Sequence, residues 1–116
     1  MDYNKVFISG EIVREPEIFS TLNNRLILKF NLQVKDKKHF NFFNAILYGE
    51  LAEKFKKNLK KGDKVFIEGK LRYTKYTTKV GAVKSKIEII VENMHIIEKG
   101  GKINDNKSTA ITTASD

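Results

Sequence analysis

The sequence contains no cysteine, no tryptophan and only one proline, Pro16, among its 116 residues. The lack of cysteine excludes disulfide bonds, thiolate metal ligands and cysteine nucleophiles, and it fits a reducing compartment. No apolar run approaches the roughly 20 residues of a membrane-spanning helix, and residues 1–5 lack the apolar segment of a signal peptide. We therefore expect a cytoplasmic protein that has no membrane partner.

Motifs for catalysis are also missing. His39 and His95 are far apart in sequence, and neither has a close histidine or pair of carboxylates, so we expect no metal site. There is no Walker-type phosphate loop and no Gly-x-Ser-x-Gly elbow. Glu88 and Glu92 lie on a predicted strand with Ile90 between them, a spacing typical of a solvated strand face. We expect no enzymatic activity and no cofactor.

Positive charge is what the chain has in excess. Lys and Arg total 22 and Asp and Glu total 14, which gives a net charge of +8. Such an excess favours polyanionic partners, with nucleic acid first and an anionic membrane surface second. The length fits one domain, which we place at residues 1–99. The composition changes at Gly100, so residues 100–116 are predicted to form a disordered tail.

Hydrophobic periodicity predicts five strands and one helix. Apolar residues alternate with a period of two within residues 6–12, 26–34, 40–48, 65–72 and 87–97. Between the third and fourth of these segments the period changes to that of a helix. Its apolar stripe consists of Leu51, Ala52, Phe55 and Leu59.

The order of these elements indicates an all-β fold. Five strands with one helix between strands 3 and 4 match the OB-fold, a partly open Greek-key barrel, although an α+β sandwich could share this order. Gly10 and Gly69, inside strands, are typical of tight bends at barrel corners. We expect Gly62 to end the helix as its C′ residue, and Phe30 and Phe55 to lie in the core.

Three blocks of sequence carry a family resemblance. Asn4-Lys5-Val6 with Ile8 and Gly10 is followed by Glu15-Pro16-Glu17; the other blocks are Leu47-Tyr48-Gly49-Glu50-Leu51-Ala52-Glu53 and residues 60–72. In this order, over residues 4 to 97, they resemble bacterial-type single-stranded DNA-binding proteins. The resemblance implies an OB-fold, single-stranded DNA as partner, a homo-oligomer (dimer or tetramer), and roles in DNA replication, recombination and repair with the proteins of those processes.

The chain also departs from this family. Residues 35–38 form a short connection, so a stacking aromatic expected there has no counterpart. The family's acidic tip that closes with Pro-Phe is replaced by Thr113-Ala114-Ser115-Asp116, which places recruitment of partner proteins through that tip in doubt. The compact sequence, rich in Asn, Lys and Ile, suggests a phage or mobile-element variant, acting in a bacterial cell or a phage-infected host.

Aromatic and basic residues are the candidate binding groups, since aromatic faces stack on bases and cations contact phosphates. The resemblance places base-stacking residues at Phe42, Tyr48 and Tyr76. Tyr73 is added because Arg72 and Lys75 alternate with the aromatics there. The candidate phosphate-binding residues are Lys5, Lys29, Arg72, Lys75, Lys79, Lys84 and Lys86.

Alternation along residues 40–48 puts Phe40 and Phe42 on one strand face and Phe43 on the other. We expect an outer face such as Phe43, Ala45 and Leu47 to supply a subunit contact. The resulting hypothesis is a non-catalytic, sequence-tolerant binder that coats and protects single-stranded DNA. Two alternatives remain: an RNA-binding OB-fold module, and a structural subunit whose exposed aromatics bind a protein partner.

Overall fold

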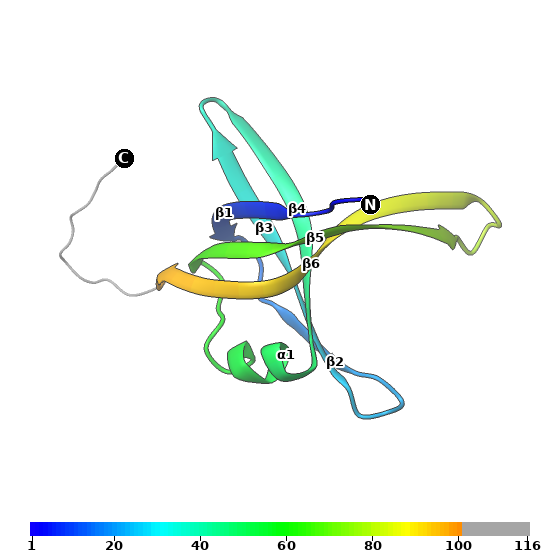
Figure 1. Ribbon diagram of the computed structural model, residues 1–116, viewed down its shortest axis with the longest axis horizontal. Helices are drawn as coiled ribbons and strands as arrows, with labels where there is room; N and C mark the ends of the chain where they lie inside the picture. The colour runs from blue at the N-terminus through cyan, green and yellow to red at the C-terminus, as the bar shows by residue number, and fades with distance from the viewer. Residues whose placement is uncertain (101–116) are drawn as a thin grey trace.

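The computed structural model describes residues 1–100, so the predicted tail after Gly100 lies outside the described residues. The elements are β1 (Val6–Ile12), β2 (Glu17–Ser20), β3 (Leu26–Asp36), β4 (His39–Tyr48), α1 (Gly49–Phe55), β5 (Lys64–Thr77) and β6 (Val83–Glu98). Figure 1 shows the strands curving around one another, with α1 below β1, β5 and β6 in this view. Within the described part of the chain, no helix is long and apolar enough to cross a membrane.

The strands form one sheet that closes on itself. Its order is β1-β5-β6-β4-β3-β2, and β1 also pairs with β3. Five strands therefore form a ring, and β2 pairs with β3 outside this ring. The all-β prediction of a five-stranded OB-fold barrel is therefore confirmed, with the helix between the third and fourth strands of the ring. The short strand β2 was not predicted, because its residues lack an alternating apolar pattern.

The core fills the inside of this ring. Phe30 and Phe55 are buried, as the sequence predicts. Val91 and Met94 both point inward although they are three residues apart, because the pairing of β5 with β6 shifts at Glu68/Gly69 and skips Glu92. The buried apolar cluster consists of Ile12, Leu28, Phe30, Leu32, Ala45, Leu47, Ala52, Phe55, Leu59, Val65, Ile67, Ile89, Val91 and Met94.

Two glycines allow strands to approach closely, as expected for barrel corners. A Cβ atom at Gly10 would clash with the carbonyl oxygen of Gln33, where β1 passes from β5 to β3. A Cβ atom at Gly69 would clash with the carbonyl oxygen of Ile90, next to the shift in register. Both positions therefore require the absence of a side chain.

Two expectations were wrong, one about the end of the helix and one about the faces of β4. The helix ends at Phe55 with Lys56 as its C-cap, so Gly62 is not its C′ residue. A turn follows the helix and Gly62, at φ 95°, lies just before β5. Ala45 and Leu47 do not form an outer contact face, since both are fully buried. Their partners on β3, Phe30 and Leu28, are core residues. This side of β4 therefore faces the inside of the barrel.

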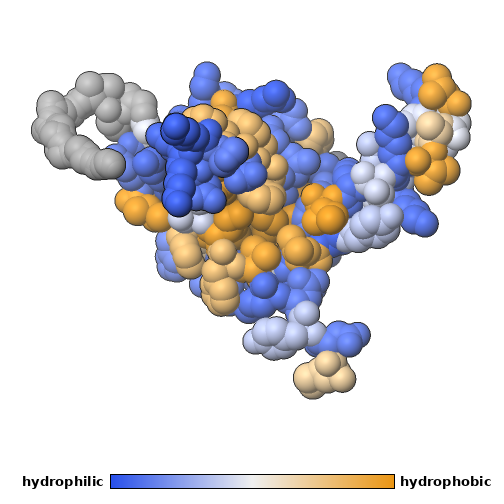
Figure 2. Space-filling view, turned by 90° about the horizontal axis from the view of Figure 1, so that it is seen from above, coloured by the Kyte–Doolittle hydropathy of each residue, from blue (hydrophilic) through white to orange (hydrophobic). Residues whose placement is uncertain are grey.

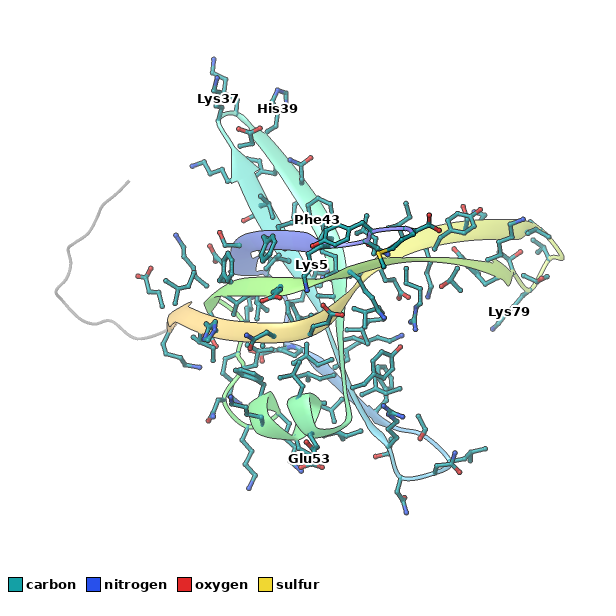
Figure 3. The ribbon with its side chains drawn as sticks, in the orientation of Figure 1. Lys5, Lys37, His39, Phe43, Glu53 and Lys79 are labelled. Carbon is teal, nitrogen blue, oxygen red and sulfur yellow. The ribbon has the colours of Figure 1, made fainter. Side chains whose placement is uncertain are left out.

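Two hairpins extend beyond the barrel. The β3–β4 hairpin turns at Lys37, whose φ of 57° lies in the left-handed region, and Figure 3 shows Lys37 and His39 at its tip. The β5–β6 hairpin turns through Gly81, and Lys79 lies at its tip. The strand residues of these two projecting arms lie beyond the core.

Candidate nucleic-acid interface

One surface of the sheet collects most of the predicted binding residues; we call it the outer face. It is formed by the side chains of β3, β4, β6 and β5 that point away from the core. Strand register sets the rows on this face: Asn31 is opposite Asn44, Asn44 is opposite Glu88, and Glu88 is opposite Arg72. Its main members are Lys29, Asn31, Phe42, Asn44, Tyr48, Arg72, Tyr76, Lys84, Lys86 and Glu88.

Tyr48 ends β4 and is fixed by two arginines. The Arg72 guanidinium donates a hydrogen bond to the Tyr48 hydroxyl over 2.8 Å and lies 5.6 Å from its ring centroid. The Arg25 guanidinium lies 5.9 Å from the same centroid. Hydrogen bonding to Tyr48, together with Glu88, raises the pKa of Arg72 against the opposing effect of desolvation. This cluster presents an aromatic ring surrounded by positive charge.

Glu88 lies beneath this cluster and is not the solvated residue that the sequence suggested. It is only 4% exposed. One carboxylate oxygen accepts a hydrogen bond from Arg72 over 3.2 Å, and the other lies 3.4 Å from the Lys86 ammonium. The expectation was wrong because β6 is flanked by β4 and β5, so neighbouring side chains cover an outward-pointing residue there.

Phe42 and Tyr76 are the more accessible aromatics of the outer face. Phe42 is 59% exposed and lies opposite Gln33 on the projecting part of β4. Tyr76 is 43% exposed and lies opposite Lys84. The Lys86 ammonium is 5.6 Å from the Tyr76 ring centroid. Each ring thus has free surface, and Tyr76 has cations beside it.

Tyr73 and Lys75 lie on the other side of the β5–β6 hairpin. Tyr73 is opposite Ile87, and Lys75 is opposite Ser85. Successive residues of a strand point to opposite faces, so Tyr73 cannot share a face with Tyr76, three residues away. The structure therefore brings three of the four candidate aromatics together and separates the fourth.

The candidate lysines have different surroundings. Lys5 is paired with Glu68 at 2.9 Å and Glu92 at 3.0 Å, and these hydrogen bonds raise its pKa. Its charge is therefore largely compensated. Lys29 lies on the outer face. Among the described residues, four of the candidates make no ion pair: Lys29, Lys75, Lys79 and Lys84.

The sequence analysis missed two residues of this surface. Arg25 follows a turn in which Asn24 has a φ of 60°, and no periodic signal links it to Tyr48. Phe19 lies on the unpredicted strand β2. Its exposed ring has the Lys29 ammonium 5.5 Å from its centroid. The pairing of β2 with β3 reveals that Phe19 borders the outer face, and the contact with the Tyr48 ring reveals the same for Arg25.

A shallow pocket of about 270 Å³ opens on the outer face between β3, β4 and the segment before β2. Arg14, Lys29 and Lys86 contribute cations to its wall, and three carboxylates, those of Glu15, Glu17 and Glu88, line it as well. Within residues 1–100, no group of three or more His, Cys, Asp or Glu side chains is arranged to hold a metal ion. The chemistry offered by this surface is stacking, hydrogen bonding and positive charge.

A five-stranded barrel in which β1 pairs with both β3 and β5 and the helix precedes β5 is an OB-fold, and here one of its faces carries aromatic and basic side chains. Within that class, the model of the single-strand binding protein family matches residues 3–97, and the chain belongs to this family.

Curated relatives agree with this assignment. The single-stranded DNA-binding protein of Aquifex aeolicus is 33% identical over 107 residues, which cover 83% of this chain and 71% of the relative. The single-stranded DNA-binding protein of Borreliella burgdorferi is 26% identical over 108 residues, with coverages of 85% and 72%.

Solved structures share the fold. The mitochondrial single-stranded DNA-binding protein Rim1 of S. cerevisiae superposes with a TM-score of 0.73 at 19% identity, covering 86% of this chain and 100% of Rim1. The Plasmodium falciparum SSB, solved in complex with ssDNA, gives a TM-score of 0.76 at 20% identity, with coverages of 84% and 97%.

Proposed function

We propose that this protein is a non-catalytic, sequence-tolerant binder that coats and protects single-stranded DNA during replication, recombination and repair. The observation that carries the proposal is the placement of Phe42, Tyr48 and Tyr76 on one outer face with Arg72 and Lys86 between them. Membership of the family and the names of the relatives support it. The proposal places the protein with DNA in the bacterial cytoplasm or a phage-infected host.

The proposed mechanism combines two physical terms. Bases stack on the exposed rings of Phe42 and Tyr76, each worth about 1–3 kcal/mol and largely independent of sequence. Phosphates contact Lys and Arg side chains and release counterions, so that affinity falls as salt rises. Tyr48 takes part once a base replaces a guanidinium at its ring. No step requires a metal or a cofactor.

Fluorescence anisotropy with labelled oligo-dT of about 35 nucleotides tests this function. We expect salt-sensitive binding, and we expect the double variant Phe42→Ala, Tyr76→Ala to weaken it by about 25-fold or more, since each lost stack costs about 1 kcal/mol or more. Tyr3→Ala, which removes an exposed aromatic that lies before β1 and outside all of the strands, is the control. Unchanged affinity of the double variant would reject this face as the binding site.

Competitor strands separate the remaining alternatives. The 2′-hydroxyl distinguishes RNA from DNA, so an RNA strand of matched sequence should compete less well than the DNA strand if DNA is the natural ligand. Duplex DNA should compete poorly, because its bases are not free to stack. Absence of binding to any strand would favour the protein-binding alternative.

We also propose that the chain forms a homo-oligomer through the side of the β5–β6 hairpin that is opposite the outer face. We call it the inner side of the hairpin. Tyr73 and Ile87 are paired there and are 61% and 60% exposed, and Leu71 lies beside them. Asn44 of β4 pairs with Glu88 of β6. Phe43, the residue before Asn44, is therefore level with Ile87 and extends the apolar row to β4. Figure 2 shows hydrophobic residues gathered in the middle of the face seen from above, inward of the hairpin that projects to the right. Exposed apolar surface of this kind is typical of protein contacts.

A further inference from the structure

Strand β2 carries an aromatic residue that neither the core nor the predicted site uses. All four residues of β2 are exposed, and Phe19 is 46% exposed. In the described part of the chain, Phe19 is not a member of the buried apolar cluster or of the side chains packed against it. A large ring on a short edge strand therefore stabilises the barrel little.

The register of the strands places Phe19 in line with the outer face. Phe19 is opposite Ile27, and Ile27 is opposite Tyr48, so the three side chains form one row across β2, β3 and β4. Neighbouring strands are about 4.8 Å apart, so Phe19 and Tyr48 are separated by roughly 10 Å along this row. The sheet order continues from β2 through β3 and β4 to β6 and β5.

A cation lies beside the Phe19 ring, as cations lie beside the rings of Tyr48 and Tyr76. The Lys29 ammonium is 5.5 Å from the Phe19 ring centroid, and the Arg25 guanidinium is 5.9 Å from the centroid of Tyr48 at the other end of the row. An aromatic face with a neighbouring cation is the pairing that holds a base and its phosphate in single-strand binding. Phe19 and Lys29 together provide both parts on one edge of the sheet.

We propose that Phe19 is a further base-stacking residue, which extends the single-stranded DNA track beyond Tyr48 to the β2 edge with Lys29 contacting the adjacent phosphate. The inference rests on the proposed function and adds one nucleotide-binding position to it. Ile18 gives an internal comparison, since it is similarly exposed, at 51%, but is opposite the core residue Leu28 and so points to the other side of β2.

A tryptophan probe tests the stacking directly. The chain has no tryptophan, so in a Phe19→Trp variant the indole emission reports on this position alone. Addition of oligo-dT should quench the emission, with a titration midpoint that matches the binding curve from anisotropy. The Ile18→Trp variant, on the opposite side of the same strand, should not be quenched. Equal quenching in both variants, or none in either, would overturn the proposal.

Affinity measurements give the second readout. Phe19→Ala should weaken oligo-dT binding about fivefold or more, whereas Ile18→Ala should leave it unchanged. Both substitutions lie on an exposed strand, and equal melting temperatures would show that the fold is intact. If Phe19→Ala binds like the wild type while the Phe42→Ala, Tyr76→Ala variant is weakened, the proposal fails and the proposed function stands. If the wild type does not bind oligo-dT, both fail.

Discussion

At the scale of single residues, a buried carboxylate organises the outer face. Glu88 is shared between Arg72 and Lys86, and Arg72 in turn is hydrogen-bonded to the Tyr48 hydroxyl. The carboxylate holds Arg72 at the Tyr48 ring, but it also neutralises charge that phosphates would otherwise use. Two effects therefore oppose each other at Glu88, since it orders the cations and weakens their field.

Substitution of Glu88 by Gln separates these effects. We expect Glu88→Gln to bind oligo-dT more tightly at low salt, because two cations lose a competing anion. The slope of log K against log salt concentration should steepen by about 0.7 for each additional phosphate that the protein neutralises on a single strand. Glu53→Gln is the control, since Glu53 also pairs with a lysine, Lys56, but lies on α1 and not on the strands of the outer face. An unchanged slope in Glu88→Gln would contradict this account.

At the scale of elements, Asp63 joins the segment after α1 to the end of β6. The buried Asp63 carboxylate accepts hydrogen bonds from the Lys60 amide at 2.9 Å, the Gly100 amide at 2.9 Å and the Lys99 ammonium at 2.7 Å. Burial alone would raise the pKa of Asp63, but these partners outweigh it and lower the pKa below the ordinary 3.8. The ionised form is therefore the one that stabilises the fold.

The sign of this pKa shift determines how stability depends on pH. The folded pKa lies below the unfolded value, so the contribution is present above about pH 4 and is lost as the pH falls through the folded pKa. Asp63→Asn should lower the free energy of unfolding at pH 7 by about 1–3 kcal/mol. Urea denaturation at pH 7 and pH 3 measures this, and the difference from wild type should shrink at pH 3. Asp36→Asn, in the exposed end of β3, should have no effect at either pH.

At the scale of the whole molecule, the two sides of the β5–β6 hairpin have different characters. The outer side carries Tyr76, Lys84 and Lys86, whereas the inner side carries Tyr73, Ile87 and a single lysine, Lys75. The net charge of +8 favours contact with DNA on the first side, and exposed apolar groups favour contact with protein on the second. One hairpin could thus serve both interactions without competition between them.

A charge placed on the inner side tests the proposed assembly. Ile87→Lys should shift the protein toward the monomer in sedimentation experiments at concentrations where the wild type is assembled, because an unpaired charge would be buried in the contact. Val80→Lys, at an exposed apolar position in the turn of the same hairpin, should leave the assembly unchanged. A monomeric wild type, or an Ile87→Lys variant that assembles normally, would exclude this surface.

Much of the fold could be predicted from the sequence, because alternation and helical periodicity follow directly from the geometry of strands and helices. The five strands of the ring, their order around the helix, the core positions Phe30 and Phe55, and the bends at Gly10 and Gly69 all follow from such local signals. The basic charge and the aromatic residues likewise indicate a nucleic-acid partner before the fold is known.

Only the tertiary structure decided which side chains share a surface, because strand register and burial depend on contacts between residues distant in sequence. Pairing across β4, β6 and β5 buries Glu88 and turns Ala45 and Leu47 into the core. The sequence by itself determined the types of group available for binding and the strands that carry them. The closure of the sheet determined which of those groups lie side by side on one face.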